Sequence, residues 1–191
     1  MNARLRLAVL ILAACPGLQA CIPLVVGAGV GAGVMMAEDR RTNATILEDQ
    51  TIEVKARNRI EEKYPEQLNV NVTSFNRYVL LTGQAPTEAI KQDLSAIVLE
   101  VPSVRNLQNE VAVAGNASFT SRSSDTLTTS SVKGRLTQNK DVGANHVKVV
   151  TENGTVYLMG LVTRAEADAA AQTAATTSGV QRVVKVFEYM D

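Results

Sequence analysis

A short apolar run that ends in glycine occurs twice in this 191-residue chain, and this duplication constrains the fold more than any other feature. The first copy runs from Tyr78 to Gly83 and the second from Thr155 to Gly160, with the two glycines 77 positions apart. In both copies the glycine is followed by a stretch of helical periodicity and then by a valine-led run. Solenoid repeats are shorter than this period. We therefore expect a duplicated domain.

The first unit shows the pattern α-β-β-α-β. Apolar residues at four-residue spacing predict a helix that starts after Asp49, its N-cap, and ends near Tyr64. Alternation over residues 68–73 predicts a strand that precedes the glycine-ended strand. A helix over 87–100 and a strand over 104–113 complete the unit.

The second unit repeats this order. Asp125 is the predicted cap of its first helix, and residues 146–151 are the predicted first strand. Asn153-Gly154 predicts a tight hairpin turn. An alanine-rich helix over 165–175 follows, with Gly179 as its C-terminal cap, before the last strand. The expected fold class is α+β, with two helices packed on one face of a three-stranded mixed sheet in each unit.

The N-terminus resembles an export signal, with two arginines, a short apolar stretch and small residues before Cys21. The sequence around Cys21 resembles the lipobox of bacterial lipoproteins. Cys15 fits that consensus equally well but leaves a shorter apolar stretch, so we predict lipidation at Cys21. The expected divisions are a signal peptide (1–20), a lipidated cysteine with tether and linker (21–48), the first domain (49–114), a linker (115–123) and the second domain (124–191).

Residues 22–37 are uncharged and rich in glycine. Residues 24–32 match a strand followed by the G-x-G-x-x-A pattern of dinucleotide-binding proteins, but that interpretation requires a surrounding βαβ unit. Only Val34 to Arg40 is available for the helix, and no second buried strand follows. We predict an apolar tether, and no nucleotide or other cofactor.

Composition argues against several classes of function. The chain has 19 basic and 19 acidic residues and no strongly basic half, which does not suggest nucleic-acid binding. His146 is the single histidine, and no cysteine follows Cys21, so the usual zinc and copper ligand sets are missing. No serine lies in a nucleophile-elbow motif. We expect a protein that is not an enzyme.

The duplicated pattern resembles the BON domain, an exported α-β-β-α-β module. Its mark is an apolar strand ending in glycine, a helix, and then a small residue and valine before the last strand. Here these residues are Gly83 and Val104 in the first unit, and Gly160 with Gly179-Val180 in the second. We expect Gly83, Gly160 and Gly179 to be structural glycines. With the lipobox, the chain resembles the dual-BON outer-membrane lipoproteins of the DolP type, which implies a lipid anchor on the periplasmic face of the outer membrane.

The resemblance also implies a function. In this family the first helix of the second domain is implicated in binding anionic phospholipid, with an aromatic residue entering the membrane. The matching position here is Leu127, and the chain has no tryptophan. The predicted function is phospholipid binding that supports envelope integrity. The predicted lipid-binding residues are Leu127, Thr128, Ser131, Lys133 and Arg135.

Two alternatives remain open from the sequence. Leu127 can instead pack against the other domain, with Lys133 and Arg135 on a solvated helix face. The protein can also be an adaptor for a cell-wall or outer-membrane assembly partner, bound through a sheet or the groove between the domains. Gly134, within the helix, costs about 1 kcal/mol relative to alanine and hints at the close approach of another group.

Overall fold

Both halves of the chain have the predicted α-β-β-α-β order in the computed structural model, which describes residues 39–65, 68–114 and 122–191. The first domain contains α2 (Asn43–Lys63), β1 (Asn69–Phe75), β2 (Tyr78–Ala85), α3 (Glu88–Leu99), β3 (Asn106–Asn109) and β4 (Ala112–Val113). The second contains α4 (Arg122–Gln138), the 3₁₀ turn η1 (Ala144–His146), β5 (Val147–Glu152), β6 (Thr155–Val162), α5 (Arg164–Ala175) and β7 (Arg182–Tyr189). The predicted signal peptide, Cys15, Cys21 and the glycine-rich tether lie outside the described residues.

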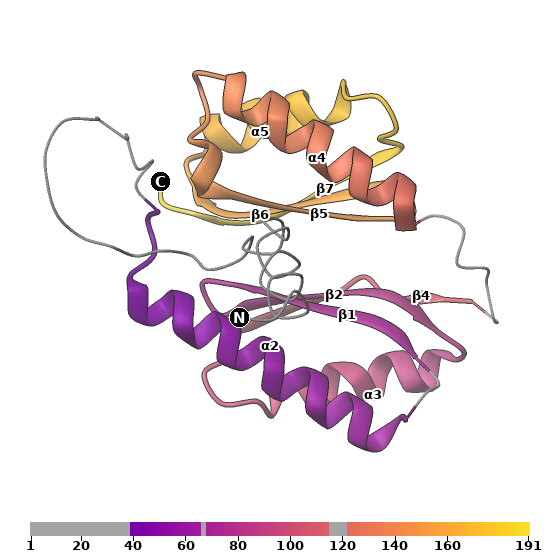
Figure 1. Cartoon of the computed structure of the whole chain (residues 1–191). Helices are drawn as coiled ribbons and strands as arrows, with labels where there is room; N and C mark the ends of the chain where they lie inside the picture. The colour runs from indigo at the N-terminus through magenta and orange to yellow at the C-terminus, as the bar shows by residue number, and fades with distance from the viewer. Residues whose placement is uncertain (1–38, 66–67, 115–121) are drawn as a thin grey trace, which may run out of the picture. The chain divides into compact units, whose positions relative to one another are not determined.

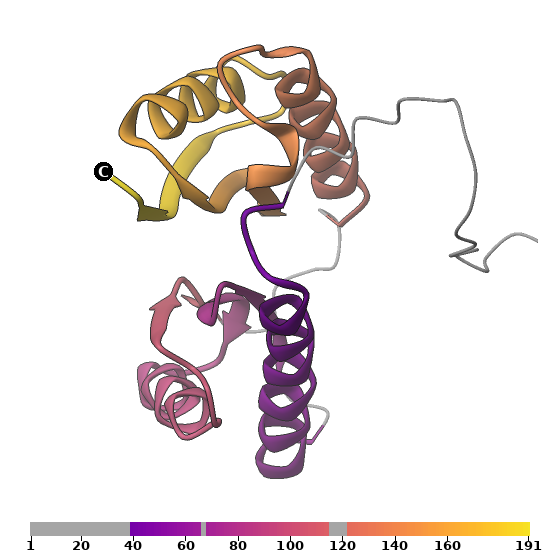
Figure 2. The same cartoon turned by 90° about the vertical axis from the view of Figure 1, so that its left-hand side faces the viewer.

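The α+β architecture is confirmed in each domain, where two helices cover one face of a mixed sheet (Figure 1 and Figure 2). In the first domain, β2 pairs antiparallel with β1 and parallel with β3. In the second domain, β6 pairs in the same way with β5 and β7. The strand that contains the repeated glycine is therefore the central strand of both sheets.

Central position explains why consecutive residues in the middle of these strands are apolar. Val79 and Leu81 of β2 face the core beneath α2 and α3, whereas Leu80 points to the opposite face of the sheet and is fully buried there. Strand β6 repeats this arrangement, with Leu158 beneath its helices and Met159 on the other face. Because both faces of the central strand are buried, its sequence does not alternate between polar and apolar residues.

The helix-free faces of the two sheets share one apolar cluster. Its fully buried members are Phe75 and Leu80 from the first domain with Tyr157, Met159 and Val186 from the second. Polar contacts between the domains accompany the cluster, including Lys148 Nζ to Glu53 Oε1 at 2.9 Å and Asn76 Nδ2 to Glu188 Oε2 at 2.7 Å. Small domains of this length bury limited surface alone, and this contact adds to what each buries.

The last strand of the first domain departs from the prediction of one continuous strand over 104–113. It begins at Asn106 and is interrupted between β3 and β4. At the interruption Glu110 N donates to Leu81 O, and the Val111 side chain is buried in the core. The break therefore turns Val111 inward while the chain stays beside β2.

The predicted N-caps Asp49 and Asp125 are both wrong. Helix α2 begins at Asn43, within the predicted linker, and the Thr42 side chain caps it by accepting from Thr45 N. Helix α4 begins at Arg122, upstream of Asp125. Both aspartates lie on the buried sides of their helices instead.

These two aspartates bind the hairpin turns of their domains. The Asp49 carboxylate accepts from Asn76 N at 2.8 Å and Arg77 N at 2.7 Å. The Asp125 carboxylate accepts from Asn153 N and Gly154 N at 2.8 and 2.9 Å. All four turn residues have positive φ, between 50° and 72°. Each first helix thus fixes a turn that otherwise favours Asn and Gly.

Gly83 and Gly160 lie inside the central strands, which continue for two residues beyond the predicted glycine ends, to Ala85 and Val162. At both glycines the backbone of the preceding segment comes close. Gly83 has a φ of 112°, and a Cβ atom there would collide with the carbonyl oxygen of Asn69 at the start of β1. A Cβ atom on Gly160 would collide with the carbonyl oxygen of His146, just before β5. These two glycines permit the same backbone approach in both domains.

Gly179 occupies a different place from the one predicted. Helix α5 ends at Ala175 with Thr176 as its C-cap, and Gly179 lies in the turn that leads to β7. Its φ is 88°, and a Cβ atom would lie 2.7 Å from the Thr128 hydroxyl. Gly179 therefore lets this turn pack against α4.

Candidate phospholipid-binding helix

Helix α4 is held in one rotational orientation by its buried side. Asp125, Thr128, Val132 and Leu136 recur at three- and four-residue spacing and are all at least nine-tenths buried. Val132 and Leu136 enter the core of the second domain, and Asp125 binds the hairpin turn. The remaining side of the helix is therefore fixed toward the surface.

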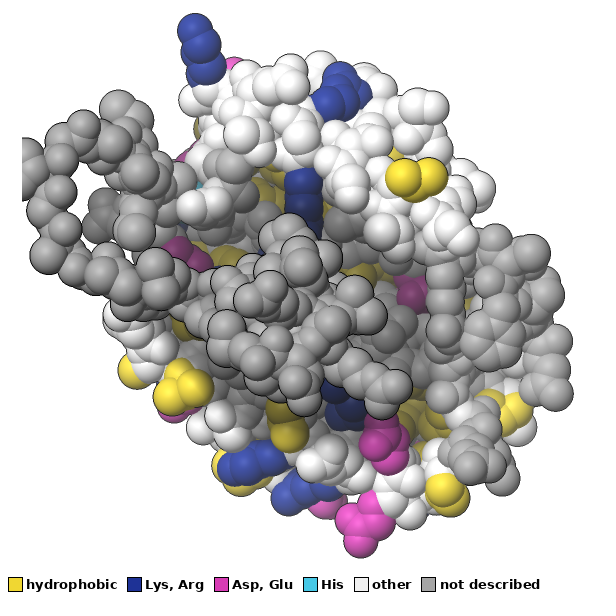
Figure 3. Space-filling view, in the orientation of Figure 1, with side chains coloured by type: hydrophobic (Ala, Val, Ile, Leu, Met, Phe, Trp, Pro, Cys, Tyr) yellow, Lys and Arg dark blue, Asp and Glu magenta, His cyan; other side chains and the backbone are white. Residues whose placement is uncertain are grey.

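The outer side of α4 combines an apolar side chain with uncharged and basic residues. Leu127 is 70% exposed, the highest value among the large hydrophobic side chains of the described residues. Ser131 and Gly134 follow it at i+4 and i+7 and are exposed as well. The only acidic residue of the helix is the buried Asp125, so this outer side carries no carboxylate. The surface over α4 is accordingly mostly uncharged, with isolated basic side chains (Figure 3).

Thr128 does not belong to the outer side, although it was predicted among the lipid-binding residues. Its side chain is 4% exposed and faces Gly179. Helical periodicity places it about 100° around the axis from Leu127. Thr128 therefore packs inside the domain.

The two basic residues of the predicted site have different surroundings. Arg135 donates to the Thr177 and Thr176 hydroxyls, at 2.9 and 3.0 Å, at the end of α5. The Lys133 side chain is exposed, and its ammonium group makes no ion pair or hydrogen bond with any described residue. Of these two residues, Lys133 is therefore the one available to an external anion.

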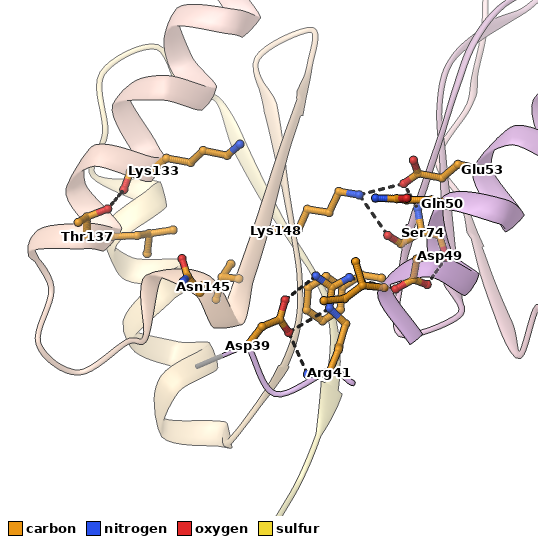
Figure 4. Close-up of a pocket in the computed structure, with 14 residues that line it drawn as sticks. Asp39, Arg41, Asp49, Gln50, Glu53, Ser74, Lys133, Thr137, Asn145 and Lys148 are labelled. Atoms are coloured by element: carbon orange, nitrogen blue, oxygen red, sulfur yellow. Dashed lines mark hydrogen bonds and ion pairs between the residues drawn. The ribbon is translucent and has the colours of Figure 1, made fainter. Parts of the chain in front are cut away.

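Lys133 also extends toward a cavity of about 560 Å³ whose other cations are already paired (Figure 4). Lys148 binds Glu53 and the Ser74 carbonyl oxygen, and the Arg41 guanidinium binds two aspartates. Lys133 therefore lies at the border between the outer side of α4 and this cavity, where it is the cation that no described carboxylate pairs.

Gly134 meets no neighbouring group. A Cβ atom at this position would have nothing within 4 Å among the described residues. No residue that the structure describes therefore makes the predicted close approach. The glycine leaves a smooth surface one turn beyond Ser131 on the outer side of the helix.

The described residues hold no group of three His, Cys, Asp or Glu side chains able to bind a metal ion. His146 Nδ1 lies 3.3 Å from Glu166 Oε1, but Glu166 also caps α5 and binds Arg40. Across the ranges that the structure describes, no helix combines the length and apolarity needed to cross a bilayer.

Sequence reasoning missed the aspartate–turn contacts and the Arg40–Glu166 pair. A signal for the first was present, because Asp49 and Asp125 are 76 positions apart, within one residue of the spacing of the glycines. Their place in the repeat implied a shared structural role. No comparable signal marks Arg40.

Known proteins resemble this chain over most of its length. The BON domain family matches residues 48–115 and 124–191. The outer membrane lipoprotein DolP of Haemophilus influenzae is 39% identical over 176 residues, which cover 91% of each protein. The 21 kDa hemolysin of Actinobacillus pleuropneumoniae is 33% identical over 80% of this chain and 79% of its own length.

A third relative matches a shorter region: the osmotically-inducible protein Y of Escherichia coli is 30% identical over 60% of this chain and 59% of its own length. The duplicated fold, the two family matches and the similarity to a lipoprotein across nine-tenths of the sequence agree with one another. The chain belongs to the BON-domain family, as a lipid-anchored outer-membrane lipoprotein with two BON domains, of the DolP type.

Proposed function

We propose that this lipoprotein binds anionic phospholipid through the outer side of α4, without catalysing a reaction, and thereby supports the integrity of the cell envelope. The observation that carries the proposal is the combination of a 70% exposed Leu127 with a helix surface free of carboxylates. Leu127 supplies an apolar wedge in place of an aromatic residue, and Lys133 supplies a cation for phosphate. Cys21, on the periplasmic side of the membrane, is the proposed site of the lipid anchor.

The expected strength of this contact is modest. A leucine side chain that leaves water contributes about 1.5–3 kcal/mol, and one basic residue near an anionic surface about 1 kcal/mol. Each buried CH₂ of an acyl chain contributes about 0.8 kcal/mol, so the anchor dominates membrane attachment. The role of α4 is then to select anionic lipid at the place where the anchor already holds the protein.

Helix α2 of the first domain offers an internal comparison. It also exposes two large apolar side chains, Leu47 at 63% and Val54 at 53%. Its surface, however, carries Glu61 and Glu62, and both are exposed. The same surface exposes Lys55, Arg57 and Arg59, so α2 carries charges of both signs. The outer side of α4 exposes no carboxylate, and on this difference we assign lipid binding to α4.

The substitution Leu127→Asp tests the proposal in a chain that starts at Asp39 and lacks the anchor. We expect its affinity for vesicles of mixed anionic and zwitterionic phospholipid to fall at least about tenfold, because the wedge is lost and a carboxylate is added. Co-sedimentation with the vesicles measures the change.

Leu47→Asp on α2 is the matched control and should bind like the unmodified chain. Both positions are exposed, so the circular dichroism spectra of the two variants should stay unchanged. Equal losses of binding in both variants, or none in Leu127→Asp, would contradict the assignment to α4.

The competing hypothesis of a protein adaptor loses one of its proposed surfaces. The helix-free sheet faces bury Phe75 and Tyr157 in a shared cluster and are not available to a partner. The groove between the domains still holds the cavity of about 560 Å³, and the uncharged start of α2, with the exposed Leu47, is a further surface that suits a protein. Normal vesicle binding by Leu127→Asp, with loss of envelope function in Leu47→Asp, would favour the adaptor.

A further inference from the structure

Arg40, just upstream of α2, binds the second domain. Its guanidinium makes two 2.8 Å bonds to the Glu166 carboxylate, and its Nη1 also donates to the Leu161 carbonyl oxygen at 2.9 Å. The pair is largely shielded, with side-chain exposures of 27% for Arg40 and 15% for Glu166. A two-bond contact between guanidinium and carboxylate is directional as well as strong.

Glu166 is held in place for this contact by its own domain. It accepts from Thr163 N at 2.8 Å in the capping box of α5, and His146 Nδ1 lies 3.3 Å from its Oε1. The Arg40 bonds, helped by those from Thr163, lower the pKa of Glu166 to about 2. The carboxylate is therefore charged throughout the neutral and mildly acidic range.

The neighbouring Arg41 binds the first domain instead. Its guanidinium contacts Asp49 at 3.0 Å and lies 3.8 Å from the centre of the Phe75 ring. Two consecutive arginines thus connect residues 39–42 to both domains. α2 does not need the Arg40 contact, because Thr42 already caps the helix.

We propose that Arg40 fixes the segment following the membrane tether to the second BON domain, through Glu166 and Leu161 O, so that the anchored chain enters the fold at the domain carrying α4. We call the Arg40–Glu166 pair the clamp. It attaches the segment after the tether to the same domain that carries α4. Its existence does not depend on lipid binding by α4, and its test has a different readout.

Trypsin tests the clamp in the mature lipid-anchored protein on vesicles, because it cleaves after Arg40 and Arg41. The test variant is Glu166→Gln, which removes the ion pair but keeps a residue that serves the capping box. We expect cleavage after these two arginines to become about tenfold faster, because its rate depends on the population of the opened segment. Mass spectrometry of the fragments measures the rate.

Asp168→Asn is the matched control, because it removes a carboxylate from the same helix. Among the described residues, Asp168 pairs with Lys185 alone, at an exposed position. The control should be cleaved at the unmodified rate. Arg40→Lys is the second test variant; it keeps the cleavage site and leaves Glu166 and the α5 cap intact, and we expect faster cleavage there too. Unmodified rates in both test variants, or an equal increase in Asp168→Asn, would overturn the clamp.

Discussion

Gly83→Ala is expected to destabilise the first BON domain by about 3 kcal/mol or more. The new Cβ atom meets the Asn69 carbonyl oxygen, and alanine disfavours the φ of 112° found there. Relief requires moving β1 away from β2, which disturbs the pairing over the whole hairpin. Urea unfolding of the chain from residue 39, followed by circular dichroism, measures the loss.

Gly134→Ala is the control for this substitution. Its Cβ atom meets no neighbour and it lies within a helix, so alanine should stabilise α4 by about 1 kcal/mol. Opposite signs in the two variants are the expected result. A small effect of Gly83→Ala would show that the strand crossing is looser than the structure indicates.

Asp49→Ala is expected to lower the free energy of unfolding by about 3–5 kcal/mol. The substitution leaves the Ser74 hydroxyl, which is fully buried, and the Asn76 and Arg77 amides without their acceptor. It also removes an ion-pair partner of Arg41. Thermal unfolding of the chain from residue 39 measures the change.

Asp93→Ala provides the comparison, because Asp93 pairs with Lys63 at the surface, where ion pairs contribute little. It should change the unfolding temperature only slightly. Similar losses in the two variants would mean that the aspartate–turn contact does not stabilise the domain as described. Amide exchange at Asn76 and Arg77 gives a local check, since both amides should exchange faster in Asp49→Ala.

Much of the fold was accessible from the sequence, because a duplicated pattern provides two readings of each element. The order of elements and the hairpin turn at Asn153-Gly154 follow from local chemistry. The resemblance marked Gly83 and Gly160 only as structural glycines, and the backbone that approaches them comes from another segment. The start of α2 was missed because Thr42 and Asp49 both have residue types that cap helices. Asp49 has the residue type of a cap, but the turn contacts that draw it into the interior come from distant residues.

The candidate site was predictable only in part. The resemblance to BON domains indicated α4 and Leu127, and the structure shows that Leu127 is exposed. Which face of the helix is outward depends on how Asp125 binds the turn, and this contact decides that Thr128 is buried. Arg135 likewise donates to Thr176 and Thr177, which directly follow α5. Spacing along the chain cannot reveal a contact between residues so far apart in sequence.

An NMR titration of the anchor-free chain from residue 39 tests lipid binding by α4 most directly. Amide shifts are recorded first with anionic and then with zwitterionic micelles. The account predicts shifts that cluster on the outer side of α4, at Leu127, Ser131 and Lys133, with anionic micelles alone. An unchanged α4, or equal shifts with both kinds of micelle, would contradict it.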